Sequence, residues 1–198
     1  TAVGRNALAA NTTGQQNAAI GYYSMGNNTT GGLNVTMMGL GNNTTGSGNV
    51  GMGWLSLSNN TTCSDNVAVG FRAAQETNSS HGIVAIGGYA LCKNTSGDNN
   101  TAVGFCSLEA NISGASNVAV GRSSLAANTT GASNTGLGYN ALTKNTTASD
   151  NTAVGSSSLA CNTTGDRNVA VGKLALGANT IGVRNVAIGQ SALDANTE

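Results

Sequence analysis

Fifteen asparagines stand in the pattern Asn-X-Ser/Thr, which is the acceptor sequence for N-linked glycans, and ten of them are the main candidates. Nine of them recur at one place of a repeated stretch, and Asn78 lies one residue away from that place. The pattern predicts glycans along one edge of the molecule; a turn held by threonine hydroxyls is the structural alternative. The candidates are Asn11, Asn28, Asn43, Asn60, Asn78, Asn94, Asn111, Asn128, Asn145 and Asn162. Overlapping sequons also begin at Asn27, Asn34, Asn42, Asn59 and Asn99.

Adjacent threonines, such as Thr129-Thr130, recur in register and raise a second kind of chemistry. Flat arrays of threonine on a β-solenoid resemble ice-binding faces. Neighbouring residues of a strand point to opposite faces, however, so each pair supplies only one threonine to any one face. Ice binding is therefore the weaker of the functional alternatives.

All seven aromatic residues fall at two adjacent places of the repeat, so we expect them to line one corner of the fold. Exposed rings are suited to stacking on sugars or docking on a partner, whereas packing on a neighbouring chain or covering the corner is the structural alternative. The candidate contact corner consists of Tyr22, Tyr23, Trp54, Phe71, Tyr89, Phe105 and Tyr139.

Reactive side chains are few and scattered. The four cysteines occupy four different places of the repeat, and only Cys92 and Cys106 fall in adjacent units, three positions out of register. This spacing leaves a disulfide between Cys92 and Cys106 possible without favouring it, and it matches no zinc site. The single histidine, His81, lies in the most irregular unit and is expected to be a turn residue. The sequence thus predicts no enzyme, no metal and no cofactor other than attached N-glycans.

The chain is a tandem repeat. If the last glycine of Asn117-Val118-Ala119-Val120-Gly121 is position 0, the same position returns every 17 residues from Gly4 to Gly189. The one gap, from Gly21 to Gly53, spans 32 residues and holds a unit that is two residues short, with Met38 at position 0. Twelve units account for the whole chain, and a fixed period of this kind marks a repeat architecture.

Position −1 is apolar in all twelve units, position +4 is leucine in most of them, and a small residue fills position −2. This alternation is typical of a short strand with its valine and isoleucine side inward. Seventeen residues are too few for a strand and a crossover helix. We therefore predict an all-β fold, a parallel β-solenoid (β-roll or β-helix) of about twelve 17-residue coils. The small residues at position −2 would let another chain approach closely, or form a second inward layer.

Asparagine recurs at position −4 and, in eleven of twelve units, at position +7. Asparagine tolerates tight turns and bonds to neighbouring backbone, so we predict two asparagine ladders at two corners of the coil. Thr77 and Ile83 interrupt the two ladders in the same region.

The charge and the apolar runs of the chain limit the classes of partner that it can bind. Eight basic and eight acidic residues give no net charge, which predicts no binding to nucleic acid. No apolar run approaches the roughly 18 residues of a membrane span. The chain opens and closes inside a unit, so we expect residues 1–198 to be a single solenoid segment of a longer array.

The motif Asn-Val-Ala-Val-Gly and its variant from Asn185 to Gly189 resemble the head repeats of bacterial trimeric autotransporter adhesins. The longer pattern with Ala-Leu and Asn-Thr-Thr-Gly is similar to fibre repeats of phages and large algal viruses. The adhesin resemblance implies a left-handed parallel β-roll with three chains side by side, although the longer unit here departs from it.

We therefore expect a structural component of an extracellular fibre or filament, with an adhesive or mechanical role and N-glycans, at a cell surface or virion surface. The shaft of a viral or phage fibre for host attachment is the first alternative, and an ice-binding solenoid is the second. The expected partners are further copies of the chain, as a trimer or fibre, and a cell-surface or carbohydrate ligand.

Overall fold

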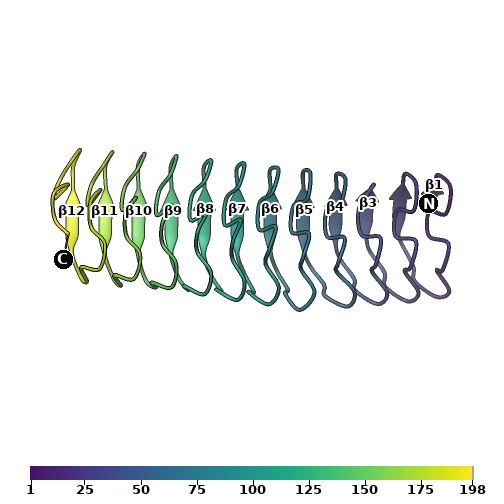
Figure 1. The fold of residues 1–198 in the computed structure, drawn as a ribbon. Coiled ribbons are helices and arrows are strands. Elements are labelled where there is room, and N and C mark those ends of the chain that lie inside the picture. The colour runs from purple at the N-terminus through teal and green to yellow at the C-terminus, as the bar shows by residue number, and fades with distance from the viewer. Residues whose placement is uncertain (198) are drawn as a thin grey trace.

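Twelve short strands, one from each repeat unit, form a single sheet whose order follows the chain (Figure 1). The computed structural model describes residues 1–197, and these residues form strands and turns but no helix. The strands are β1 (Ala2–Val3), β2 (Ala18–Ile20), β3 (Val35–Met37), β4 (Val50–Met52), β5 (Val67–Val69), β6 (Val84–Ile86), β7 (Thr101–Val103), β8 (Val118–Val120), β9 (Thr135–Leu137), β10 (Thr152–Val154), β11 (Val169–Val171) and β12 (Val186–Ile188).

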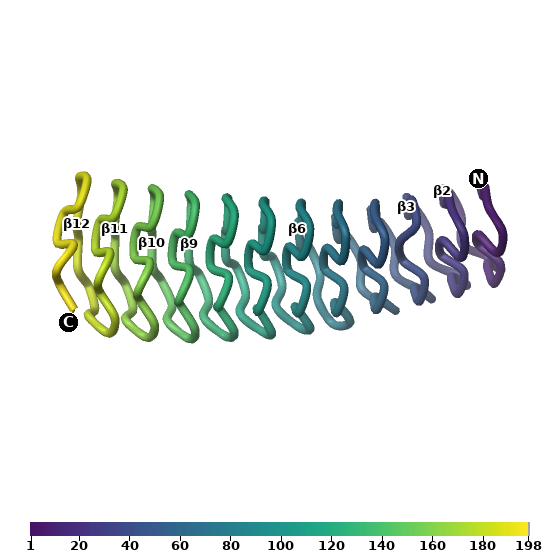
Figure 2. Tube along the Cα trace, turned by 45° about the horizontal axis from the view of Figure 1, so that its top comes forward, coloured from purple at the N-terminus to yellow at the C-terminus, as the bar shows by residue number. Residues whose placement is uncertain are grey.

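Each unit makes one coil, or rung, of a parallel β-solenoid. Ala119 of β8 pairs with Ala102 of β7 on one side and with Gly136 of β9 on the other, so equal positions of successive units lie over one another. The tube in Figure 2 shows this path repeated from one end of the rod to the other. The predicted fold class is confirmed.

The strands face the opposite way from our prediction. Position −2 points inward: Ala119 is 0% exposed, as are its alanine equivalents from Ala68 to Ala170, whereas Val118 beside it is 38% exposed. The reason is the small cross-section of a 17-residue coil. Leu125 and Asn128 already fill the interior of the rung, and the remaining space admits only an alanine, glycine or threonine. Valine and isoleucine therefore stand outside.

Tight corners are made by residues in the left-handed backbone region. In the β8 unit, Ser123, Leu125 and Ser133 have φ angles of 57°, 53° and 58°. Such angles are costly for residues other than glycine. The bond from the Leu125 N–H to the carbonyl of Ala141, at 2.9 Å, shows how the next rung holds this conformation. A single unit therefore depends on its neighbours for its shape.

The short rung, which contains β3, lacks positions +1 and +2. Its Met38 N–H donates to the Ile20 carbonyl, as position 0 does elsewhere, and its Gly39 carbonyl accepts from Met25, as position +3 does elsewhere. Met38 takes a φ of 62° to turn the chain without the missing residues. One corner of this rung is consequently absent.

Candidate functional site

The asparagines at position +7 form a ladder inside the rod. The side-chain amide of Asn128 donates to Oδ1 of Asn111 and to the carbonyl of Gly131, both at 2.9 Å. Asn145 repeats the same pair of bonds one rung later, at 2.9 Å each. Both hydrogens of each amide are used, and the side chains are fully buried.

This ladder counts against glycans at most of the predicted sites in the folded rod, because a glycan on Nδ2 would remove a donated hydrogen and could not fit within the rod. The candidate asparagines that lie inside the rod instead of at its edge are each 0% exposed: Asn28, Asn43, Asn60, Asn94, Asn111, Asn128, Asn145 and Asn162. Asn11, in the first rung, is half-buried and also donates, to the Gly14 carbonyl at 3.0 Å. Asn78 is exposed. The exposed overlapping sequons begin at Asn42, Asn59 and Asn99.

A second ladder, at position −4, runs beside the first. Oδ1 of Asn117 accepts from the backbone N–H of Asn134 at 2.9 Å, while its Nδ2 donates to the Gly131 carbonyl at 2.9 Å. The Gly131 carbonyl therefore accepts from Asn117 and Asn128 together. The two predicted ladders are present, and they lie in the interior.

The first ladder is interrupted where Thr77 replaces asparagine. Oδ1 of Asn60 and Oγ1 of Thr77 are buried without a hydrogen-bond partner. One rung later, Asn94 donates to Oγ of Ser80 at 2.9 Å, so the serine hydroxyl replaces the missing amide oxygen. Because Thr77 takes the buried ladder position, Asn78 falls one place later in the unit and lies at the surface.

The two threonines of a pair lie in different environments. In six of the seven pairs the first hydroxyl donates to a backbone carbonyl of the next rung, as Thr129 Oγ1 does to the Thr146 carbonyl at 3.0 Å. The second threonine, Thr130, is exposed. Only one column of threonines per pair is thus available at the surface.

The aromatic corner is formed as predicted, at positions +1 and +2 of successive rungs. Tyr89 makes edge-to-face contacts with Phe71 and Phe105, at centroid separations of 5.3 and 5.9 Å. The Arg72 guanidinium lies 5.4 Å from the centroid of Phe71. These contacts support the structural alternative, in which the aromatic side chains cover the corner of the coil.

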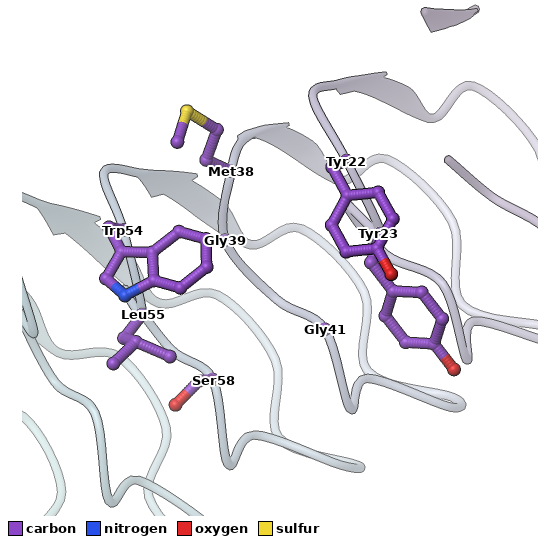
Figure 3. Close-up of a pocket in the computed structure, with 8 residues that line it drawn as sticks. All are labelled: Tyr22, Tyr23, Met38, Gly39, Gly41, Trp54, Leu55 and Ser58. Carbon is purple, nitrogen blue, oxygen red and sulfur yellow. The ribbon is translucent and has the colours of Figure 1, made fainter. Parts of the chain in front are cut away.

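At one end of the aromatic corner the missing residues of the short rung leave a slot of about 380 Å³ (Figure 3). Tyr22 and Tyr23 of the rung before, and Trp54 of the rung after, stand on opposite sides of it. The residues that line the slot are Tyr22, Tyr23, Met38, Gly39, Gly41, Trp54, Leu55 and Ser58. The shortened spacing from Gly21 to Gly53 is the sequence signal that could have located it.

The outer face is the second feature that sequence reasoning missed. We use this name for the outward side chains at positions −3 and −1 of β1 to β12. Ten of them are 38–72% exposed although they are large and apolar: Val3, Ile20, Val35, Met37, Met52, Ile86, Val118, Leu137, Val186 and Ile188. They come from eight of the twelve strands and leave apolar side chains exposed from one end of the described rod to the other.

The four thiols are free. Burial raises the pKa of Cys106 to about 11, with a further rise from its hydrogen bond to Glu109. Burial also raises the pKa of the Cys63 and Cys92 thiols. His81 occupies a turn, where its Nδ1 accepts from the Ser64 N–H at 3.1 Å, as expected for a structural histidine.

Residues 1–197 contain no helix long and apolar enough to cross a membrane. Within the same residues, no three side chains of histidine, cysteine, aspartate or glutamate gather as a metal site would require. Comparison with protein-family models, curated proteins and solved structures finds no match to the chain.

Proposed function

We propose that this chain is a structural rod of an extracellular fibre, without catalytic activity, and that copies of it associate side by side through the outer face. The observation that carries the proposal is the series of exposed apolar side chains on the outer face. Exposed apolar surfaces of this extent usually mark interaction sites. Val118 at 38% exposure and Leu137 at 45%, both in interior rungs, would be a liability on a rod that stayed single in water.

A second copy is the occupant that fits this surface best. Eleven layer spacings give a face roughly 50 Å long, and three-residue strands make it roughly 10 Å wide, or roughly 500 Å². Two such faces together bury roughly 1,000 Å², which reaches the lower limit for a stable interface, and a third chain or a longer array adds to it.

The absence of charge on the outer face also favours association between copies of the same chain. No charged residue occurs between positions −4 and 0 in any unit, so two outer faces bring no like charges together. Because equal positions repeat along the rod at one fixed spacing, two copies can match rung for rung. The trimer implied by the adhesin resemblance is one closed arrangement of this kind.

The shaft of a viral or phage fibre remains the alternative, because it needs the same stiff, self-associating rod. Ice binding is less well supported, since half of the threonine hydroxyls bond to the backbone. We further propose that N-glycans are confined to exposed asparagines, such as Asn78, and that the rod stands at a cell or virion surface.

Sedimentation velocity tests the association. We expect the unmodified chain to sediment as a dimer or trimer and the double variant Val118→Lys, Leu137→Lys to sediment as a folded monomer. Thr130→Lys, an equally exposed substitution away from the outer face, is the control and should leave the oligomer intact. A monomeric unmodified chain, or equal disruption by the control, would refute the proposal.

A further inference from the structure

The missing corner of the short rung breaks a hydrogen-bond pattern that the rest of the rod keeps. In nine pairs of adjacent rungs, the N–H at position +2 donates to the carbonyl at position +1 of the rung before; Arg72 to Trp54 and Tyr89 to Phe71, at 3.0 and 2.9 Å, are examples. The short rung has neither position. This leaves two corner groups without their usual partner.

These groups are the carbonyl of Tyr22 and the N–H of Leu55. Within residues 1–197 neither makes a hydrogen bond. By equivalence with the nine intact pairs, the Tyr22 carbonyl points forward along the rod and the Leu55 N–H points back, so both are directed at the missing corner. One rung spacing added to a normal bond puts them roughly 8 Å apart. The slot thus presents an acceptor on one wall and a donor on the other.

The remaining lining of the slot is uncharged and includes three aromatic rings. Tyr22, Trp54 and Met38 are 63%, 51% and 47% exposed around it. Tyr23 is held in place, because its ring packs on Gly26 and its hydroxyl donates to Oδ1 of Asn27 at 3.2 Å. At Gly41 an added Cβ would meet no atom within 4 Å, so this part of the slot is open.

We infer that the slot is a binding site for a neutral sugar ring. The inference goes beyond the proposed structural rod and does not depend on association through the outer face. A pyranose ring has apolar C–H faces that pack against aromatic rings, whose faces carry partial negative charge. Its hydroxyls both donate and accept, so one ring can satisfy the Tyr22 carbonyl and the Leu55 N–H together. The volume of about 380 Å³ falls within the range of small-molecule sites.

Other ligands use the slot less completely. A purely apolar ligand would bury the Tyr22 carbonyl and the Leu55 N–H without partners, which is unfavourable. An added peptide strand needs a row of backbone groups, whereas the slot offers one donor and one acceptor. An anionic ligand finds no cationic side chain among the lining residues.

Trp54 is the only tryptophan, so its fluorescence reports on the slot directly. The full chain would be titrated with cellohexaose, maltohexaose and a galactose-terminated oligosaccharide. We expect a saturable change with at least one of them, with a Kd on the order of 1 mM for a single ring. Tyr22→Ala should weaken this binding at least tenfold, and Phe105→Ala, at the same corner but away from the slot, should not.

A filled variant supplies the sharpest control. Met38→Gly combined with two serines inserted after position 38 restores the 17-residue spacing and both corner bonds while keeping every aromatic residue. We expect it to fold, to retain Trp54 fluorescence and to lose the sugar response. Binding that persists in the filled variant, or no response to any sugar at roughly ten times the expected Kd, would overturn the inference.

Sedimentation of the same samples separates this result from the proposed fibre. Sugar binding by monomeric rods would support the slot and refute the association, and association without any sugar response would do the reverse. A Trp54 change that follows rod concentration in sugar-free buffer would identify a second copy as the occupant of the slot and would also overturn the inference.

Discussion

The side-chain amide of Asn128 donates to Oδ1 of Asn111 across 2.9 Å, one rung away, with both side chains fully buried. A polar ladder of this kind replaces part of the apolar core that a 17-residue coil has no room to hold. Each amide in it depends on its neighbours in the rungs before and after. The stability of the rod should therefore respond sharply to single changes in the ladder.

Replacing Asn128 with alanine should destabilise the rod more than any surface change. The substitution leaves Oδ1 of Asn111 without a donor and takes one acceptor from the Asn145 amide. Each buried polar group left unpaired costs about 1–3 kcal/mol. Urea unfolding followed by circular dichroism measures the loss. Asn78→Ala, at an exposed position, is the control and should change stability by less than about 0.5 kcal/mol.

The break in the ladder at Thr77 should be repairable. Thr77→Asn combined with Ser80→Gly reproduces the residues found in regular units and gives Oδ1 of Asn60, now unpaired, a donor. We expect the double variant to gain about 1–3 kcal/mol, since Oδ1 of Asn60 acquires a donor and the unpaired Oγ1 of Thr77 is removed. Thermal unfolding would show the gain as a higher Tm. An unchanged or lower Tm would mean that the local backbone does not adopt the regular turn.

The facing of the strands can be tested with one substitution at each of two adjacent positions. Ala119→Leu puts a large side chain into a filled interior, and overpacking of this kind typically costs about 1–3 kcal/mol. Val118→Leu adds bulk on the outer face and should be close to neutral. If Val118→Leu were the more damaging change in a monomeric variant, the observed facing would be wrong.

Glycan mapping distinguishes the buried from the exposed sequons. In a eukaryotic secretion host, we expect glycopeptides only from exposed asparagines, among them Asn42, Asn59, Asn78 and Asn99. Asn111 and Asn128 should be recovered unmodified, because their amides are occupied inside the rod. Mass spectrometry of proteolytic peptides measures each site separately. A glycan on Asn128 in folded material would contradict the ladder.

The cysteines predict how stability responds to alkaline pH. Burial raises the pKa of Cys106 from 9.0 to about 11, so folding favours the protonated thiol. This contribution is fully present below pH 9.0 and is lost as the pH rises through about 11. Unfolding free energies measured across this window should fall with pH, and Cys106→Ser should flatten the slope. An equal slope in the serine variant would assign the loss to other groups.

Much of the fold could be predicted because the coil length and the strand register follow directly from the repeat. The spacing from Gly104 to Gly121 to Gly138 fixes the length of a coil, and parallel register follows when equal positions stack. The aromatic corner followed from the same comparison of positions. Periodicity could not decide which side of Val118-Ala119-Val120 is interior, because both sides of that strand are apolar. The answer depends on the volume left inside the coil.

The asparagine ladder shows the same limit. A turn asparagine and a buried asparagine look alike in sequence, so Asn128 fitted the pattern for glycosylation as well as the pattern for a corner. The recurrence of asparagine at position +7 matched that of the buried Leu125, and this strictness was a sign of an interior position. The slot at Met38 depended on which two residues were missing, and only the backbone hydrogen bonds identify them.

The bonds that join the rungs run along the rod, so a pull on its two ends would load every layer with the same force. A layer that lacks bonds then separates at a lower force. Around Met38 the corner bonds to the Tyr22 carbonyl and from the Leu55 N–H are both absent. A ligand that bonds to both groups would link the rungs on either side of the gap and should raise the force at which they separate.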